Sequence, residues 1–442
     1  MIPSLVALAL ASTSPAATGS TVTERSVAAH EAFLASDALQ GRGSATRDEA
    51  IAAAYVASQF QSYGLTPPPG MTGYLQTATI VKQKLSGPIL LTADGGPVTQ
   101  ATLLTGAGKA ITGPLAAVED PKDLPSAPIV LLTANSFDAM QLFRAARDKH
   151  VALLLIRESD ATRKLATMIR APRLPAYLEG ETPPDQPAIV TVPDAAVDAL
   201  AGKPGVAVTL TVPTAADKSQ TTNAIGYLKG SDPKAGTLLF SAHLDHLGVR
   251  PDGTIMHGAN DDASGTTAVL ELAKALSSGK RSKRNILFVA YGSEEIGEYG
   301  STYFGEHPPI PLNQIVANVE FEMIGAQDPK LPKNTLMMTG FERSNLGAAL
   351  KKHGALVTGD PYPEQRFFER SDNYALALKG IVAHTVSGWA VTPTYHQPTD
   401  TYENLNIPFM TMAIRSLVAP LEWLANSNFV PAWKPGGQPS KN

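Results

Sequence analysis

The sequence contains no cysteine, which excludes disulfide bonds, thiol catalysis and lipid attachment through a cysteine. It also lacks an excess of either charge: 36 Lys and Arg face 40 Asp and Glu, and the net charge of -4 argues against an extended nucleic-acid-binding surface. No apolar run reaches the roughly 20 residues that a membrane-spanning helix needs. With 43% hydrophobic and 17% charged residues over 442 positions, the composition predicts a soluble protein with more than one domain.

The two ends of the chain differ in composition from the rest. Residues 1–17 are small and apolar and are similar to the apolar core and cleavage region of a secretory signal, although no Lys or Arg precedes Arg25. We predict a signal peptide over residues 1–18 and export to the periplasm or the medium; the alternative is a disordered tail. Residues 431–442, rich in Pro, Gly and Lys, are predicted to be disordered.

The hydrophobic pattern divides the remainder of the chain. Between residues 87 and 215, short apolar runs alternate with Pro, Gly and Asp turns, which predicts a separate β-rich domain. This domain is inserted into a second, larger domain made of residues 19–86 and 216–430. In the latter segment strand-like runs alternate with helical patterns, so we predict an α/β fold with a mostly parallel central sheet and helices on both faces.

Histidine and carboxylate side chains gather in five clusters after strand-like segments or in Gly-, Pro- or Ser-rich loops: residues 243–246, 260–262, 294–295, 320–322 and 395–400. An open α/β sheet brings such residues together at the carboxyl ends of its strands. Two histidines and several carboxylates, without cysteine, form a ligand set suited to zinc or a related divalent metal. The sequence therefore predicts a metal-dependent hydrolase.

Each cluster also has a structural interpretation. His243, at a strand end, could be merely hydrogen-bonded, and Asp262 or Ser264 could cap the helix that follows. The adjacent carboxylates of Asp261 and Asp262 repel each other, however, and a carboxylate that bridges two cations would relieve that repulsion. Adjacent glutamates at 294 and 295 could be solvated, or could divide metal binding and proton transfer between them.

The last two clusters are harder to explain structurally. Strand alternation places Glu320 and Glu322 on one face of a buried strand, where carboxylates need partners or a metal. His396 lies in a Pro/Thr loop, where a histidine has no packing reason to be.

In combination, these motifs resemble the zinc aminopeptidases of metallopeptidase family 28. The family has, in chain order, His-x-Asp, Gly-Ala-x-Asp-Asp-x-Ser-Gly, Glu-Glu-x-Gly, an Asp-Met strand end and Tyr-His-x-Pro-x-Asp. The resemblance covers about residues 23–86 and 223–429, including the segment around Gly41-Arg42. The insertion resembles a protease-associated domain by its pattern and position.

The resemblance implies two Zn²⁺ ions per chain, with these metal ligands: His243, Asp261, Glu295, Glu322 and His396. His243 and Glu322 would bind one ion, Glu295 and His396 the other, and Asp261 both. Asp245 would orient His243, and Glu294 would be the general base. A cis peptide between Asp261 and Asp262 is also implied.

Two positions depart from the family pattern. Glu322 stands where the family has aspartate, and Ser371-Asp372-Asn373 replaces the common Ser-Asp-His. The activity implied is removal of N-terminal amino acids from peptides with a free N-terminus; no oligomeric state follows from the sequence.

Three other functions remain open on this fold. A carboxypeptidase or dipeptidase would need a cation for the substrate carboxylate, for which Arg366 and Arg370 are available. A glutaminyl cyclase would typically use one zinc ion. A non-catalytic receptor-like binding module should have lost metal ligands.

Overall fold

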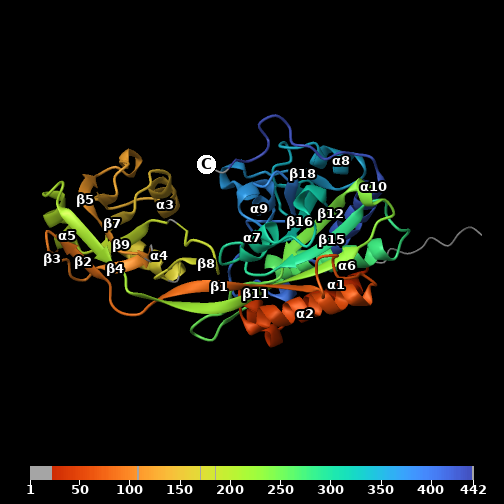
Figure 1. Cartoon of the computed structure of the whole chain (residues 1–442), viewed down its shortest axis with the longest axis horizontal. Coiled ribbons are helices and arrows are strands. Elements are labelled where there is room, and N and C mark those ends of the chain that lie inside the picture. Colours follow the sequence, from red (N-terminus) through yellow and green to blue (C-terminus); the bar gives the residue numbers. More distant parts are fainter. Residues whose placement is uncertain (1–21, 107–108, 170, 185, 441–442) are drawn as a thin grey trace, which may run out of the picture.

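The computed structural model describes residues 22–106, 109–169, 171–184 and 186–440, so the predicted signal peptide lies outside the described residues. The molecule has two lobes (Figure 1), a larger one built on a nine-stranded sheet and a smaller one built on an eight-stranded sheet. Strands β1 (Leu75–Leu85) and β11 (Thr214–Leu228) pair antiparallel along their shared length and run from one lobe to the other. The insertion therefore leaves and re-enters the larger lobe through one two-stranded ribbon.

The centre of the larger sheet is parallel, in the order β19-β16-β12-β15. These strands are β12 (Thr237–His243), β15 (Asn285–Tyr291), β16 (Ile315–Glu322) and β19 (Ala383–Ser387). Every residue of β12, β15 and β19 is buried, as expected for parallel strands that are covered on both faces. The α/β prediction is confirmed, and the parallel pairing that it expected occupies the sheet centre.

The flanking strands complete the sheet on both sides. On one side β11, β1 and β8 (Ala176–Leu178) pair antiparallel, and on the other β17 (Leu336–Met338) pairs antiparallel with β19 and parallel with β18 (Val357–Gly359). Strand β8 belongs to the segment predicted as an insertion, yet it forms the edge of the larger sheet. The insertion thus contributes one strand to the lobe from which it emerges.

Helices cover both faces of the larger sheet. The first face carries α1 (Glu24–Leu34), α2 (Arg47–Ser62), α6 (Ser264–Ser277), α8 (Leu346–Lys352) and α10 (Ile407–Asn426). The second carries α7 (Tyr299–Glu306) and α9 (Asn373–Ala377). Alternate side chains of β12 feed the two cores, because Leu238 and Phe240 pack with the first set of helices and Leu239 with the second.

The smaller lobe has its own sheet, in the order β3-β2-β10-β5-β6-β7-β9-β4, and apolar cores on both sides of it. Its strands are β2 (Leu90–Ala93), β3 (Gly96–Pro97), β4 (Thr102–Thr105), β5 (Ile111–Val118), β6 (Ile129–Leu132), β7 (Leu153–Arg157), β9 (Ala188–Val192) and β10 (Ala207–Thr211). Its helices are α3 (Ala139–Asp148), α4 (Asp160–Met168) and α5 (Asp194–Ala201). It is therefore an α/β unit more than a purely β-rich one.

The prediction of a disordered C-terminal tail is wrong for residues 431–440, which pack on the larger lobe. The indole N–H of Trp433 donates to the carbonyl of Gly380 (3.0 Å), and the Lys434 amide donates to the carbonyl of Arg343 (2.8 Å). The Trp433 ring lies against Phe368 and His384, and this apolar contact offsets the polar composition of the tail. Within the described part of the chain, no helix combines the length and apolar character that a membrane span requires.

Candidate metal centre

The sequence clusters meet at one edge of the larger sheet. His243 ends β12, Glu322 ends β16, and Glu294 and Glu295 follow β15. His396 lies in the loop after β19. Because these strands are parallel neighbours, their carboxyl ends converge, and the structure brings every predicted ligand to the same place.

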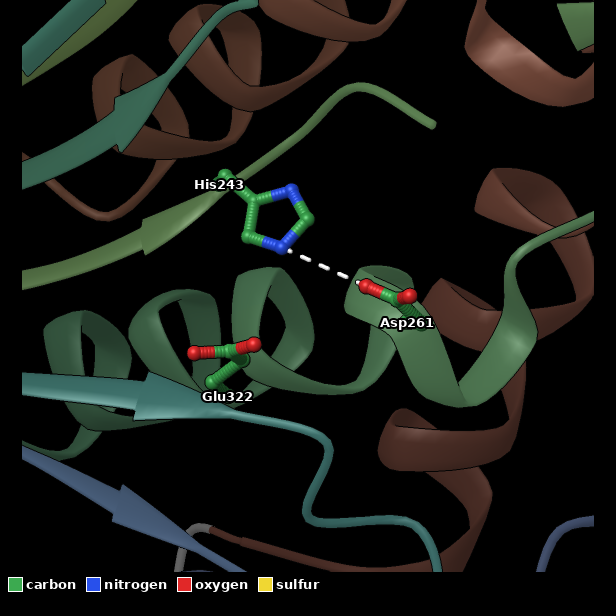
Figure 2. A group of neighbouring side chains, drawn as sticks. All are labelled: His243, Asp261 and Glu322. Carbon is green, nitrogen blue, oxygen red and sulfur yellow. Dashed lines mark ion pairs between the residues drawn. The ribbon is translucent and has the colours of Figure 1, made fainter. Parts of the chain in front are cut away.

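The first group of possible metal ligands is His243, Asp261 and Glu322 (Figure 2), whose ligand atoms lie within 4.8 Å of one another. They come from the end of β12, the turn Ala259–Ala263 and the end of β16. Nε2 of His243 lies 3.4 Å from Oδ1 of Asp261, and both side chains are buried. Three separate elements thus present one ligand each to a common point.

The second group shares Asp261. Nε2 of His396 lies 3.2 Å from Oδ2 of Asp261 and 3.1 Å from Oε2 of Glu295. A further histidine, His246, also belongs here, since it groups with Asp261 and Glu295 within 4.8 Å. Asp261 therefore presents one carboxylate oxygen to each group, as a bridging ligand would.

Distances and burial both fit a zinc-type cation on each side of Asp261. Two ligand atoms that are each about 2.0–2.1 Å from a tetrahedral zinc lie roughly 3.3 Å apart. The contacts of His243 and His396 with Asp261 measure 3.4 and 3.2 Å. In addition, Nε2 of His243 and Oδ2 of Asp261 are buried without a hydrogen-bond partner, which is costly unless a cation satisfies them.

Asp262 has a different role from its neighbour. Its Oδ1 accepts from the amides of Gly265 and Met323 (both 2.9 Å), and its Oδ2 accepts from the amide of His243 (3.3 Å). It caps the start of α6 and ties the ends of β12 and β16 together. The capping interpretation therefore holds for Asp262, and the cis peptide between Asp261 and Asp262 is present.

Asp245 holds the turn that carries the two glutamates. Its Oδ1 accepts from the amide of Glu294 (3.0 Å), and its Oδ2 accepts from the amide of Glu295 (3.3 Å) and the hydroxyl of Ser44 (2.5 Å). Nδ1 of His243 lies 3.2 Å from the backbone carbonyl of Asp245 and 3.7 Å from its carboxylate. Asp245 is thus placed to orient His243 mainly through its carbonyl, while its carboxylate positions the glutamates.

The environment shifts the pKa values of the adjacent Glu294 and Glu295 in opposite directions. Burial raises the pKa of Glu294 well above its usual range; His243 offsets part of this effect, and the charge of Glu295 adds to it. For Glu295, burial and Asp261 raise the pKa, but His246 and His396 outweigh them and the net pKa is lowered. Opposite shifts in neighbouring carboxyls are typical of one proton-transferring group beside one that stays ionised.

Sequence reasoning missed residues that lie behind the ligands. The guanidinium of Arg42 is fully buried and donates to the carbonyls of Leu244 (2.8 Å), His257 (2.7 Å) and Gly258 (2.7 Å). It thereby connects the N-terminal segment to the turn after β12 and to the turn that carries the candidate ligand Asp261. The resemblance around Gly41-Arg42 was the available signal, but nothing in the sequence shows that this arginine is buried.

Glu320 belongs to neither group of candidate ligands. It accepts from the hydroxyls of Ser371 (2.8 Å) and Thr385 (3.1 Å) and from the amide of Asn373 (2.5 Å). These hydrogen bonds provide partners for the Glu320 carboxylate, which the sequence predicted to lie on the same face of the strand as Glu322. Asn373, at the position of the family histidine, accepts from the Thr385 hydroxyl (2.9 Å) in this network.

The comparison with known protein families agrees with this geometry. The model of peptidase family M28 matches residues 223–419, which contain both groups of candidate ligands. This part of the chain belongs to peptidase family M28. The resemblance in the sequence is thus confirmed for the catalytic segment, whereas the inserted lobe lies outside the match.

Similar proteins include aminopeptidase YwaD of Bacillus subtilis, 29% identical over 194 residues that cover 42% of this chain and 40% of the relative. A probable leucine aminopeptidase 2 of Aspergillus oryzae is 27% identical over 241 residues, or 47% of this chain and 45% of the relative. The chain thus spans less than half the length of these curated relatives.

Two solved structures share the fold over both lobes. An aminopeptidase from Aneurinibacillus sp. strain AM-1 superposes with a TM-score of 0.59 at 18% identity and covers 96% of this chain and 98% of its own. A zinc aminopeptidase from Bacillus subtilis gives a TM-score of 0.55 at 20% identity, with coverages of 92% and 96%. Both lobes of this chain thus have counterparts in the fold of these two structures.

We expect Glu322→Ala to lower zinc content from two ions to about one per chain, because it removes a ligand of the first group only. Glu322→Asp should retain more zinc, since the carboxylate remains. Elemental analysis of dialysed protein measures both, with Glu342→Ala as control for an exposed glutamate. Unchanged zinc content in Glu322→Ala would assign the ligand to another residue.

Proposed function

We propose that the M28 peptidase domain removes N-terminal amino acids from peptides with two zinc ions per chain. His243 and Glu322 would hold one ion, Glu295 and His396 the other, and Asp261 would bind both. The observation that carries this proposal is the position of Asp261, whose two oxygens face the two groups at 3.4 and 3.2 Å from the histidine nitrogens. A single-ion site would leave one of these groups without a cation.

The residues around the ions have separate tasks in hydrolysis. Zinc, when bound, polarises the scissile carbonyl and lowers the pKa of a water molecule. Glu294 accepts the proton of the attacking water and returns it to the leaving amine. Its raised pKa suits both transfers, and its partial exposure gives it access to substrate and water. Asp245 fixes the backbone of Glu294 while this proton moves.

The charge of the site supports recognition of a free α-amine. Carboxylates of Asp261, Glu294 and Glu322 surround the place where a peptide would meet the metals. A protonated or metal-bound amine is the group that such a negatively charged surface would attract. We infer that the N-terminal residue of the substrate lies there.

One observation favours a second candidate, a dipeptidase or carboxypeptidase. Arg366 forms an ion pair with Glu369, so it is occupied. Arg370 instead lines a pocket together with Glu322, Phe367 and Tyr395, and its guanidinium lies 5.0 Å from the centre of the Phe367 ring. It is a cation that could receive a substrate carboxylate beside the metal site.

Blocked peptides decide between these candidates. Acetylation of the N-terminus should reduce cleavage at least about a hundredfold, because the acetylated nitrogen carries no charge and is a poor metal ligand, so it can no longer pair with the acidic groups or bind a metal. Amidation of the C-terminus should change the rate little. Chromatographic assay of one tripeptide in free, acetylated and amidated forms measures both effects. Tolerance of acetylation with loss of cleavage on amidation would favour the carboxypeptidase and contradict the aminopeptidase.

A further inference from the structure

His246 is the one histidine of the first sequence cluster to which the family resemblance gives no role. Its side chain is fully buried, and its ring centre lies 5.7 Å from that of the candidate ligand His396. Nδ1 lies 2.6 Å from Oε1 of Glu295 and 3.8 Å from Oδ2 of Asp261. His246 therefore lies beside two members of the second group, Glu295 and Asp261.

The surrounding backbone makes room for this ring and holds it. Gly258 has a φ of +59°, and a Cβ atom there would lie 2.4 Å from Cγ of His246, so any side chain at this position would displace the ring. The amide of His246 donates to the carbonyl of Arg42 (3.0 Å), while the guanidinium of Arg42 donates to the carbonyl of Gly258 (2.7 Å). The imidazole is thus fixed from both sides.

The distances distinguish a residue that binds the metal from a residue that holds a metal ligand in place. Ligand atoms that share one tetrahedral zinc lie roughly 3.3 Å apart, and the contact of Nε2 of His396 with Oε2 of Glu295 is 3.1 Å. The contact of Nδ1 of His246 with Oε1, at 2.6 Å, is too short for that geometry. The two atoms form a buried ion pair, and neither has a hydrogen-bond partner elsewhere among the described residues.

We propose that His246 is a positioning residue that pairs through Nδ1 with Oε1 of Glu295 and so leaves Oε2 to face the second metal. This inference rests on the proposed zinc function. Because His396 comes from a loop and its side chain is 34% exposed, the orientation of Glu295 decides how well the second group is formed. Partners that orient a metal ligand in this way typically contribute about 10- to 100-fold in metal affinity.

The test is a zinc titration of the full-length, metal-stripped protein against a chromophoric chelator. His246→Ala should still bind two ions at saturation, but the affinity of the more weakly bound ion should fall about 10- to 100-fold. His246→Asn, whose amide N–H can donate from nearly the position of Nδ1, should recover most of that loss. His353→Ala, a change of an exposed histidine stacked on Trp423, should leave both affinities unchanged.

Cobalt substitution adds a readout of the ligands themselves. Wild type and His246→Ala should give the same visible absorption bands, because the donor atoms are unchanged. A chain that holds only one ion at saturation in His246→Ala, with altered cobalt bands, would make His246 a ligand and overturn the inference. So would unchanged affinity, or a loss that asparagine does not recover.

The same titration separates this inference from the proposed function. Wild-type protein that binds no zinc would overturn both, whereas two ions in every variant with equal affinities would overturn only the role of His246. If His246→Ala does not fold, His246→Asn still decides, because a loss of about tenfold or more in this donor-preserving variant would contradict the inference.

Discussion

Glu294→Gln should lower kcat by at least about a hundredfold and leave two zinc ions in place. Glutamine keeps the size of the side chain and cannot accept the proton of the attacking water. The bond from the Glu294 amide to Asp245 comes from the backbone, so the variant should preserve the turn that also carries Glu295. Turnover of an aminoacyl-p-nitroanilide and zinc content of the same preparation measure the two effects.

The control for this change is Glu364→Gln, in which an exposed glutamate outside the candidate ligands loses its charge. It should retain wild-type turnover. Substantial activity of a fully metallated Glu294→Gln protein would remove Glu294 from proton transfer. A loss of zinc together with activity would instead make Glu294 part of metal binding.

Asp261→Asn should have a still larger effect, a loss of kcat/KM on the order of a thousandfold or more, together with loss of at least one zinc ion. Asparagine offers one oxygen, whereas Asp261 presents Oδ1 to His243 at 3.4 Å and Oδ2 to His396 at 3.2 Å. One half of the centre should therefore lose its shared ligand. Kinetics at saturating zinc and elemental analysis check this result.

Asp252→Asn changes an exposed aspartate and serves as the matched control. Thermal unfolding of the metal-free proteins shows whether Asp261→Asn has the wild-type fold. Full zinc occupancy and normal turnover of folded Asp261→Asn would show that the two groups do not share this carboxylate.

The sequence could place His243, Glu295 and Glu322 because each ends or follows an apolar run that forms a strand of the sheet. His243 and Glu322 terminate strands of the parallel centre, and topology alone then brings them together. The glutamate at 322 fills its group despite the departure from aspartate. Local pattern and chain order predicted the place of these residues in the fold, and their role as ligands is what the family resemblance implies.

Residues that act through distant contacts could not be predicted in the same way. The guanidinium of Arg42 reaches carbonyls more than 200 positions away in the sequence, and Asp245 binds amides about 50 positions away. A sequence pattern records neither contact, because burial of a charged group depends on the packed partners around it. The ordered C-terminal segment was missed for a similar reason, since its polar composition conceals the anchor Trp433.

The inserted lobe shows where composition misleads. The short apolar runs of this segment predicted strands, and the segment does form strands. One of them, β8, pairs with β1 and so belongs to the sheet of the larger lobe. Strand pairing is chosen by three-dimensional neighbours, so a boundary drawn from composition alone cannot assign such an edge strand. The helices α4 and α5 are short, and each is anchored by apolar side chains, Leu165 in α4 and Val197 and Leu200 in α5, that contact the lobe's own cores.

The most direct test of the proposed dizinc centre is the zinc content of the purified, dialysed wild-type protein, determined by elemental analysis. Two zinc ions per chain are expected, because two groups of ligands share Asp261. One ion per chain would contradict the paired centre and favour a cyclase-like site, and a folded protein without zinc would contradict the account as a whole.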